Sequence, residues 1–201
     1  MGVAVFGGQI YCFGGVNGTG GNTAAEAYDP EGDVWREVAP LPVARQWGPA
    51  VGIDGLCYLV GGGSANAAFE TVLIYDPATD EWHKGTRMLT PRRALAIGVV
   101  GKKIYAIGGA KKMLWANAMR ITEVYDTTTD SWSPLPAKLG EPRMAHTVSV
   151  VDGVIFSIGG FLRLGGGPHV LAVESYDTGV RSLSVSPRGK SHTSWGGLKT
   201  L

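Results

Sequence analysis

The 201-residue sequence contains little cysteine, little charge and no long apolar run. Cys12 and Cys57 stand alone, with no histidine beside them. We therefore expect neither a disulfide framework nor a zinc site, and interpret both as small buried apolar residues. No run of about 18 apolar residues is present, so no membrane-spanning helix is predicted. The first 15 residues lack a basic segment and an apolar stretch, which argues against a signal peptide and favours the cytoplasm, with the nucleus as the alternative.

Charged residues make up only 17% of the chain, and 18 basic against 17 acidic residues leave a net charge of +1. Because no block of like charges exists, we expect no nucleic-acid or membrane partner. The histidines are widely spaced and lack paired carboxylates, so no metal site and no cofactor are predicted. No local nucleophile and base motif is visible, and we predict a non-enzymatic protein, although residues distant in the sequence could still form such a site.

Glycine, in contrast, is abundant, and much of it falls in a periodic pattern. Gly-Gly pairs recur 47, 47 and 51 residues apart, each directly after a short apolar run such as Cys57–Val60. A period of this length is typical of propeller repeats, and an apolar run closed by glycine predicts a strand buried on both faces. The paired residues, which we interpret as structural, are Gly14, Gly15, Gly61, Gly62, Gly108, Gly109, Gly159 and Gly160.

Aromatic residues repeat in step with the glycines. Tyr-Asp pairs begin at Tyr28, Tyr75, Tyr125 and Tyr176, and seven residues later stand Trp35, Trp82 and Trp132, with Leu183 in the fourth position. The residues between Tyr and Trp predict a hairpin turn, because Asp and Pro favour turns. We interpret the three tryptophans as the core between neighbouring sheets, since indole supplies a large apolar face and one N–H donor.

An arginine also recurs once per repeat, at Arg45, Arg92 and Arg143, ahead of a further strand and a tight turn such as Asp54-Gly55. Because the three are periodic, we interpret them first as braces that hydrogen-bond neighbouring backbone carbonyls. Ligand binding is the alternative interpretation.

Together these features resemble the kelch repeat over nearly the whole chain. The resemblance implies an all-β fold in which antiparallel four-stranded blades surround a central channel, usually in a ring of about six. We expect about four blades, near residues 1–41, 42–89, 90–138 and 139–185, followed by an irregular tail over 186–201. The propeller is then expected to be incomplete and open, and the missing blades of a larger propeller are a candidate partner.

The resemblance further implies a protein-interaction module, such as a scaffold or the substrate-recognition part of a ubiquitin-ligase adaptor. Kelch proteins commonly bind peptides through the loops after Gly-Gly and through residues beside the repeat arginine. Because the corresponding residues are basic, polar and aromatic, we expect an acidic peptide motif as ligand. The candidate partner-binding residues are Gln46, Trp47, Arg93, Lys111, Lys112, His146 and Arg163.

A sugar-active or glycan-binding propeller, similar to sialic-acid mutarotases, is the alternative function. Arg92, Arg143 and His146 would then face the channel and grip an acidic sugar. A structural role for His146 in packing near the channel is also open.

Overall fold

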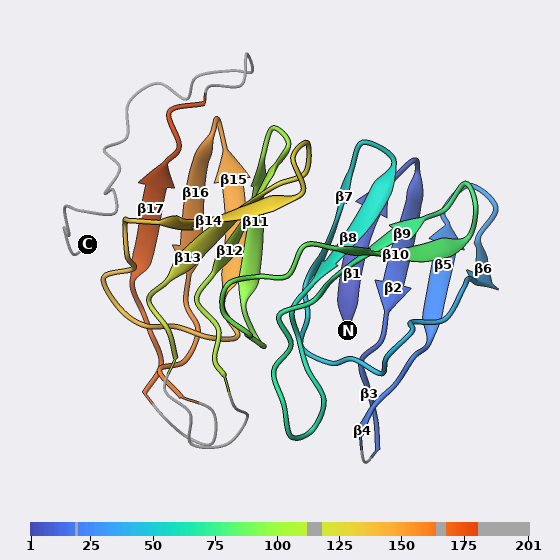
Figure 1. Cartoon of the computed structure of the whole chain (residues 1–201), viewed down its shortest axis with the longest axis horizontal. Coiled ribbons are helices and arrows are strands. Elements are labelled where there is room, and N and C mark those ends of the chain that lie inside the picture. Colours follow the sequence, from blue (N-terminus) through green and yellow to red (C-terminus); the bar gives the residue numbers. More distant parts are fainter. Residues whose placement is uncertain (19, 112–117, 164–167, 181–201) are drawn as a thin grey trace. The chain divides into compact units, whose positions relative to one another are not determined.

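The computed structural model describes residues 1–18, 20–111, 118–163 and 168–180 (Figure 1). These residues form 17 strands, turns and loops, and no helix occurs among them. The all-β prediction is therefore confirmed. Two compact units are present, which we call unit 1 and unit 2. Unit 1 comprises the described residues of Met1–Leu95 and Ala110–Met113, and unit 2 those of Ala96–Gly109 and Leu114–Leu201.

Unit 1 holds two antiparallel four-stranded sheets, blade 1 and blade 2, and a short hairpin. In both blades, strands that are consecutive in the sequence are neighbours in the sheet. The one exception is the β3–β4 hairpin, which lies between β2 and β5 in the sequence and forms a separate two-stranded sheet. Blade 1 consists of β1 (Gly2–Phe6), β2 (Gln9–Phe13), β5 (Ala25–Asp29) and β6 (Val34–Glu37), with β3 (Val16–Asn17) and β4 (Gly20–Gly21) as the hairpin. Blade 2 consists of β7 (Ala50–Ile53), β8 (Leu56–Val60), β9 (Val72–Asp76) and β10 (Glu81–Gly85).

Unit 2 holds blades 3 and 4. Blade 3 consists of β11 (Ala96–Val100), β12 (Lys103–Ile107), β13 (Thr122–Asp126) and β14 (Ser131–Leu135). Blade 4 has three described strands, β15 (Thr147–Val151), β16 (Val154–Ile158) and β17 (Val173–Asp177). A fourth strand would fall at Leu183, which lies outside the described residues, as does the predicted tail over 186–201.

The predicted turns appear where the sequence places them. Asp54 and Gly55 have φ values of 49° and 85°, and Asp152 and Gly153 have 49° and 75°. Positive φ at both central residues is the signature of the type I′ hairpin turn, which matches the twist of the strands it joins. At the other hairpin of blade 2, the Tyr75 hydroxyl donates to Asp80 Oδ1 at 2.7 Å.

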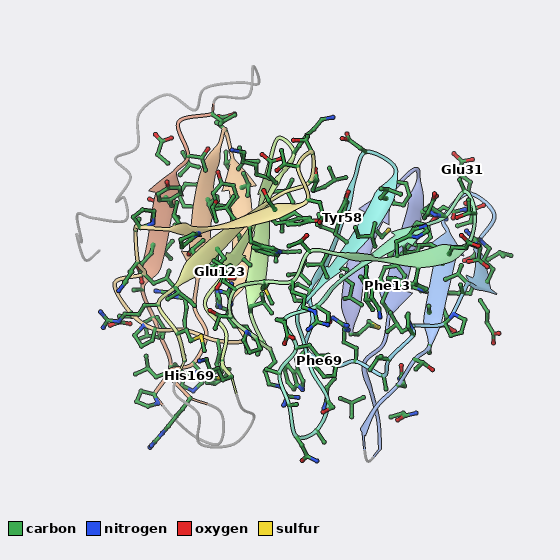
Figure 2. All side chains as sticks on the ribbon, viewed as in Figure 1. Phe13, Glu31, Tyr58, Phe69, Glu123 and His169 are labelled. Atoms are coloured by element: carbon green, nitrogen blue, oxygen red, sulfur yellow. The ribbon has the colours of Figure 1, made fainter. Side chains whose placement is uncertain are left out.

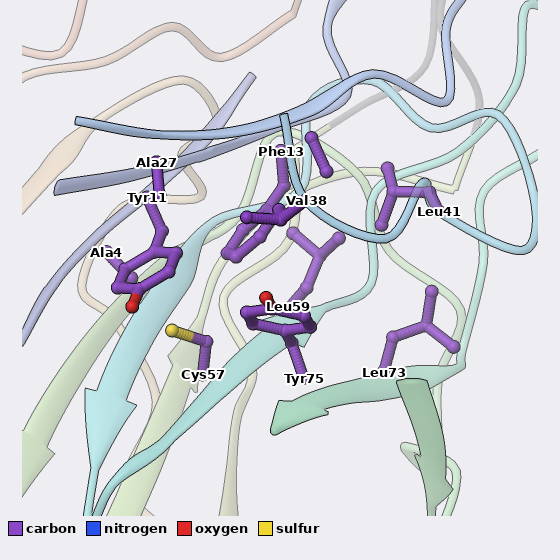
Figure 3. Packing of buried hydrophobic residues seen from close by; sticks show 11 residues of the cluster. Ala4, Tyr11, Phe13, Ala27, Val38, Leu41, Cys57, Leu59, Leu73 and Tyr75 are labelled. Carbon is purple, nitrogen blue, oxygen red and sulfur yellow. The ribbon is translucent and has the colours of Figure 1, made fainter. Parts of the chain in front are cut away.

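The core of unit 1 lies between the facing sheets of blades 1 and 2 (Figure 3). Phe13 of blade 1 meets Tyr75 of blade 2 with ring centroids 5.8 Å apart, and Trp82 lies edge-on to Phe13 at 5.0 Å. The Trp82 Nε1–H donates to the Ala39 carbonyl at 2.8 Å. For Trp82 the prediction of a core residue between sheets is confirmed. Cys57 is buried in this cluster, as expected.

Trp35 and Cys12 depart from the predictions. Trp35 is 56% exposed, so its assignment to a core between sheets is wrong for the described chain. The equivalent Trp82 packs on the blade that precedes its own, and no described blade precedes blade 1. Cys12 is half-buried rather than buried.

The core of unit 2 is largely aliphatic. Ile107 and Val124 of blade 3 cluster with Ile155 of blade 4, and Val148 and Val150 pack against them. Trp132 is half-buried and lies 5.0 Å from Tyr125 of its own blade, so its assignment to a core between sheets stays a prediction.

The first three Gly-Gly turns are each capped by the backbone of the next repeat arginine. The Gly62 N–H donates to the Arg92 carbonyl at 2.8 Å. Gly61 has a φ of 59°, and a Cβ at Gly61 would stand 2.6 Å from the same carbonyl oxygen. Glycine is thus required by conformation and by close approach. Gly15 and Gly109 repeat the hydrogen bond, to Arg45 and Arg143.

Candidate binding site on the loop face

The predicted binding residues of unit 1 lie beside the loops that follow Gly-Gly. The β3–β4 hairpin and the loop after β8 project from the same end of this unit (Figure 1). Gln46 pairs with Gly63 of that loop through two backbone hydrogen bonds of 2.9 Å, and Arg93 pairs with Ala110 through two of 3.0 Å. The residue after each repeat arginine is thereby fixed to the first residue after a Gly-Gly pair.

Arg93 is buried rather than exposed. It is 1% exposed, and its Nη2 donates to the Ser64 carbonyl. Its Nε and Nη1 have no hydrogen-bond partner in the described part of the chain. Burial lowers the pKa of the guanidinium, because desolvation penalises the charged form. Arg93 is thus buried beneath the loop that contains Ser64, and its role in partner binding stays a prediction.

Gln46 and Trp47 differ in accessibility although they are neighbours. Gln46 is 4% exposed, and its role in partner binding stays a prediction. Trp47 is 38% exposed and has a φ of 59°, which is uncommon for a bulky residue. Its carbonyl accepts the N–H of Ala94, the equivalent residue of the next repeat, at 2.9 Å, which accounts for the conformation. The backbone therefore holds an accessible indole at this end of unit 1.

Lys111 supplies a second accessible group in unit 1. It is exposed and directly follows Ala110, the backbone partner of Arg93. Lys112 lies outside the described residues. The structure therefore brings Trp47 and Lys111 to the loops that cover Arg93 and leaves the role of Lys112 as a prediction.

His146 and Arg163 belong to unit 2. His146 is half-buried, and neither ring nitrogen has a partner among the described residues. Desolvation first, and then the charge of Arg143, lower its pKa to about 3. At neutral pH the imidazole is uncharged and offers no cation to an acidic ligand. Arg163 is exposed, and its role as a contact residue stays a prediction.

Arg45 serves as a brace. Its Nη1 donates to the carbonyls of Gly61 at 2.6 Å and Thr71 at 3.2 Å, and its Nη2 donates to Thr71 Oγ1 at 2.7 Å. The guanidinium carbon lies 5.2 Å from the ring centre of Phe69, which Figure 2 labels. Burial lowers the pKa of Arg45 to about 10. The brace interpretation is confirmed for Arg45, whose contacts include no carboxylate.

Arg143 braces blade 4 with the help of a buried acid. Its Nη1 contacts the carbonyls of Ser157, Gly159 and Ala172, and its Nη2 forms an ion pair with Glu174. Glu174 also accepts the N–H groups of Gly140 at 2.6 Å and Glu141 at 3.1 Å.

The sequence analysis missed Glu174. A signal for it existed, because a glutamate stands two residues before the Tyr-Asp tyrosine in three repeats, at Glu26, Glu123 and Glu174.

The two arginines named for the sugar-binding alternative are buried. Arg92 and Arg143 are both 0% exposed, and Arg143 is engaged with carbonyls and Glu174. Within the described ranges, no group of three or more metal-ligating side chains is found. No helix long and apolar enough to cross a membrane is found among the described residues.

The chain belongs to the kelch family. The model of the Kelch motif matches residues 1–42, 49–89 and 91–138, which together cover most of the chain. This membership agrees with the glycine, tyrosine and arginine positions described above and confirms the resemblance. The four antiparallel sheets are therefore blades of a kelch-type propeller.

Several curated relatives are kelch-repeat proteins. The chain is 28% identical to Kelch-like protein 35 of Mus musculus over 195 residues, covering 96% of this chain and 32% of that protein. It is 27% identical to Kelch repeat and BTB domain-containing protein 12 of Homo sapiens, covering 68% of this chain and 25% of that protein. Beta-scruin of Limulus polyphemus is 28% identical, with 79% of this chain and 18% of that protein covered. The chain thus spans a third or less of these relatives.

The comparison with solved structures agrees on the fold. A structure described as "Structure of YjhT" matches with a TM-score of 0.73 and 19% identity, covering 94% of this chain and 66% of that one. At this identity the likeness shows the fold alone. Kelch-repeat relatives of the kinds named above are typically protein-interaction or adaptor modules, which is the class of protein that the fold and family define.

Proposed function

We propose that the chain is a protein-interaction module that binds an acidic segment of a partner protein at the loop end of unit 1. The single observation that carries the proposal is the buried guanidinium of Arg93, whose Nε and Nη1 have no hydrogen-bond partner in the described chain. A buried charge is costly unless it is paired. A carboxylate supplied by a partner would reduce that cost.

The electrostatics of unit 1 support the same ligand class. Arg45 and Arg93 are both buried, and the ion pairs of the described residues include neither of them. In a low-dielectric interior their charges are poorly screened, so we expect them to favour negative charge on a ligand at this end of the unit. Lys111 adds an exposed cation directly after Ala110, whose backbone pairs with that of Arg93. An acidic segment is therefore attracted to this end of the unit.

Trp47 and the loop after β8 define how such a segment would bind. Exposed tryptophan is enriched at binding hot spots, because it buries a large apolar surface at a small cost in conformational entropy. The Ser64 carbonyl already accepts one N–H of Arg93. A ligand carboxylate would reach the remaining N–H groups only if the loop that contains Ser64 moves aside. Trp47 and Lys111 are therefore the residues that would contact the ligand directly. Arg93 would contribute its positive charge from below the loop.

We infer that this module recruits a partner for a larger assembly, as a scaffold or as the substrate-recognition part of a ubiquitin-ligase adaptor. The names of the relatives, which include a BTB domain-containing kelch protein, favour this role. Because the chain spans a third or less of those relatives, the role of the whole assembly belongs to this proposal and not to the structure.

Isothermal titration with hexaglutamate tests the proposal, with hexaglutamine as the uncharged control. We expect binding of hexaglutamate alone, which weakens as salt is raised because the attraction is screened. Lys111→Glu should weaken it at least tenfold, and Trp47→Ala should weaken it by a similar factor.

Lys84→Glu provides the matched control. Lys84 is an exposed residue of β10, so the substitution reverses the same charge outside the loops. Equal losses for the Lys111 and Lys84 variants would show that binding follows net charge and not this site. Equal binding of hexaglutamate and hexaglutamine would also overturn the proposal.

A further inference from the structure

Asn17 is the last residue of β3, and it is the one asparagine of the sequence that glycine follows. Both Asn17 and Gly18 are exposed. A Cβ at Gly18 would meet no atom within 4 Å, so the space around this stretch of backbone is open. No hydrogen bond joins the Asn17 side chain to another described residue. The Asn17 amide and the Gly18 backbone nitrogen are therefore both accessible to solvent.

The other described asparagines lack this combination. Asn22 is followed by Thr23, and its Oδ1 accepts a backbone N–H two residues further on at 3.1 Å. Asn66 is followed by Ala67. A side chain on the following residue shields the backbone nitrogen from attack on the asparagine amide, and glycine has no side chain. Asn17 is thus the described asparagine whose amide carbon is most open to the nitrogen of the next residue.

The hairpin that carries Asn17 is also weakly held. β3 and β4 pair through two residues each, Val16 with Gly21 and Asn17 with Gly20. The neighbouring strands β1 and β2, in contrast, pair through five residues each. A two-stranded ribbon this short is marginally stable in water, so we expect it to open locally at a small cost in free energy. Local opening gives Asn17 the backbone freedom that a ring closure needs.

We propose that Asn17 is a deamidation site, at which the side-chain amide converts to a carboxylate without an enzyme. The Gly18 nitrogen loses its proton to hydroxide, and its electron pair attacks Asn17 Cγ. The Cγ–Nδ2 bond breaks, and Nδ2 takes a proton from water and leaves as ammonia. Water then opens the cyclic imide, by cleaving the new Cγ–N bond to yield aspartate or the backbone C–N bond to yield isoaspartate. The net reaction consumes one water, releases one ammonia and changes no oxidation state.

The modification has two consequences, the second of which rests on the proposed function. Isoaspartate carries the backbone through Cβ and lengthens it by one carbon, so the pairing of Asn17 with Gly20 is lost. Both products also add a negative charge to the loop end of unit 1, where the β3–β4 hairpin lies (Figure 1). A negative charge there repels an acidic ligand. Deamidation is therefore a slow, irreversible change that lowers the affinity of this end for an acidic segment.

Mass spectrometry of the full chain tests the modification, after storage for days at neutral and at mildly alkaline pH. Peptides that contain Asn17 should gain the mass difference between an amide and a carboxylic acid, and electron-transfer fragmentation distinguishes aspartate from isoaspartate. We expect conversion of Asn17 at least tenfold faster than that of Asn22 or Asn66. The rate should rise with pH, because the attacking nitrogen must lose its proton.

Three variants make the test specific. Asn17→Gln should suppress conversion at this position, because the longer side chain must close a larger ring. Asn17→Asp reproduces the charge of the product with an ordinary backbone, and we expect it to weaken hexaglutamate binding at low salt at least twofold. Thr79→Asp adds the same charge to the exposed turn between β9 and β10, outside the loops, and should leave binding unchanged.

Equal conversion of the three asparagines, or none at Asn17, would overturn the modification site and leave the proposed function intact. Equal binding by the Asn17→Asp and Thr79→Asp variants would overturn the effect on the ligand. If the unmodified chain does not bind hexaglutamate, the proposed function fails and the effect on the ligand fails with it, while the mass measurement alone decides the modification site.

Discussion

The two units differ in the residues packed between their blades, a region that we call the seam of each unit. In unit 1 the seam is aromatic, with Phe13, Tyr75 and Trp82 in contact, and the repeat arginine Arg45 is held by carbonyls and a hydroxyl. In unit 2 the seam is aliphatic, and Arg143 is paired with the buried carboxylate of Glu174. The backbone contacts of the two arginines are nevertheless the same, since each carbonyl caps a Gly-Gly turn.

The difference shows that the repeat preserves a backbone geometry and leaves its charge balance free to vary. Where a carboxylate accompanies the arginine, as in unit 2, the charge is neutralised inside the protein. At Arg45 in unit 1, two carbonyls and a hydroxyl hold the guanidinium instead. The function proposed for unit 1 depends on this contrast, and the following predictions test it.

The largest expected effect is at the ion pair. Arg143→Ala leaves Glu174 buried and unpaired, and should lower the free energy of unfolding by about 3–5 kcal/mol. Arg45→Ala leaves only uncharged acceptors and should cost about 1–3 kcal/mol. Urea denaturation measures both. The double variant Arg143→Met with Glu174→Gln removes both charges and should recover part of the loss, whereas equal losses for the two alanine variants would remove the contrast between the seams.

Glycine substitutions separate close approach from backbone conformation. Gly61→Ala should cost about 3 kcal/mol, because its Cβ would stand 2.6 Å from the Arg92 carbonyl oxygen at a φ of 59°. Gly159 has a φ of 67°, but the nearest atom to its Cβ is 3.9 Å away. Gly159→Ala should therefore cost only about 1–2 kcal/mol. Thermal unfolding compares them, and a larger loss at Gly159 would contradict the role given to the following arginine.

Acid should weaken unit 2 through His146. Its pKa is about 3 in the folded chain against 6.5 as the ordinary value, so the unfolded state binds the proton first. The free energy of unfolding should fall by about 1.4 kcal/mol for each pH unit below 6.5, or by about 2–3 kcal/mol at pH 4.5.

Hydrogen exchange at pH 7 and pH 4.5 measures the acid effect, which should appear in β11 and β15 and vanish in His146→Gln. Unit 1 provides the internal control, because the only histidine among its described residues is the exposed His83. Loss of protection in β2 and β8 to the same extent would show that the effect does not come from His146.

The smallest effect concerns the tryptophans. Trp82→Phe removes the hydrogen bond to the Ala39 carbonyl and part of the contact with Phe13, and should cost about 1–2 kcal/mol. Trp35→Phe alters an exposed side chain and should change stability by less than about 0.5 kcal/mol. Denaturant midpoints measure both, and a similar cost for Trp35 would mean that it already has a structural partner.

Much of the fold could be predicted from periodicity alone, because strands, turns and glycine positions follow local rules that repeat. The seam at Trp82 and the brace at Arg45 followed from the same argument. The exposure of Trp35 could not be predicted that way, since it depends on which blade lies beside it. The burial of Arg93 was also missed, because a second arginine beside the periodic one gives no sign of which side chain faces the loops.

The most direct test of the account is a map of where an acidic ligand binds. Backbone amide shifts of the full chain are followed by nuclear magnetic resonance while hexaglutamate is added at low salt. The account predicts shifts at Gln46, Trp47 and Arg93 in unit 1 and none at Gly140 or Glu174 in unit 2. Shifts of equal size in both units, or none in unit 1, would contradict it.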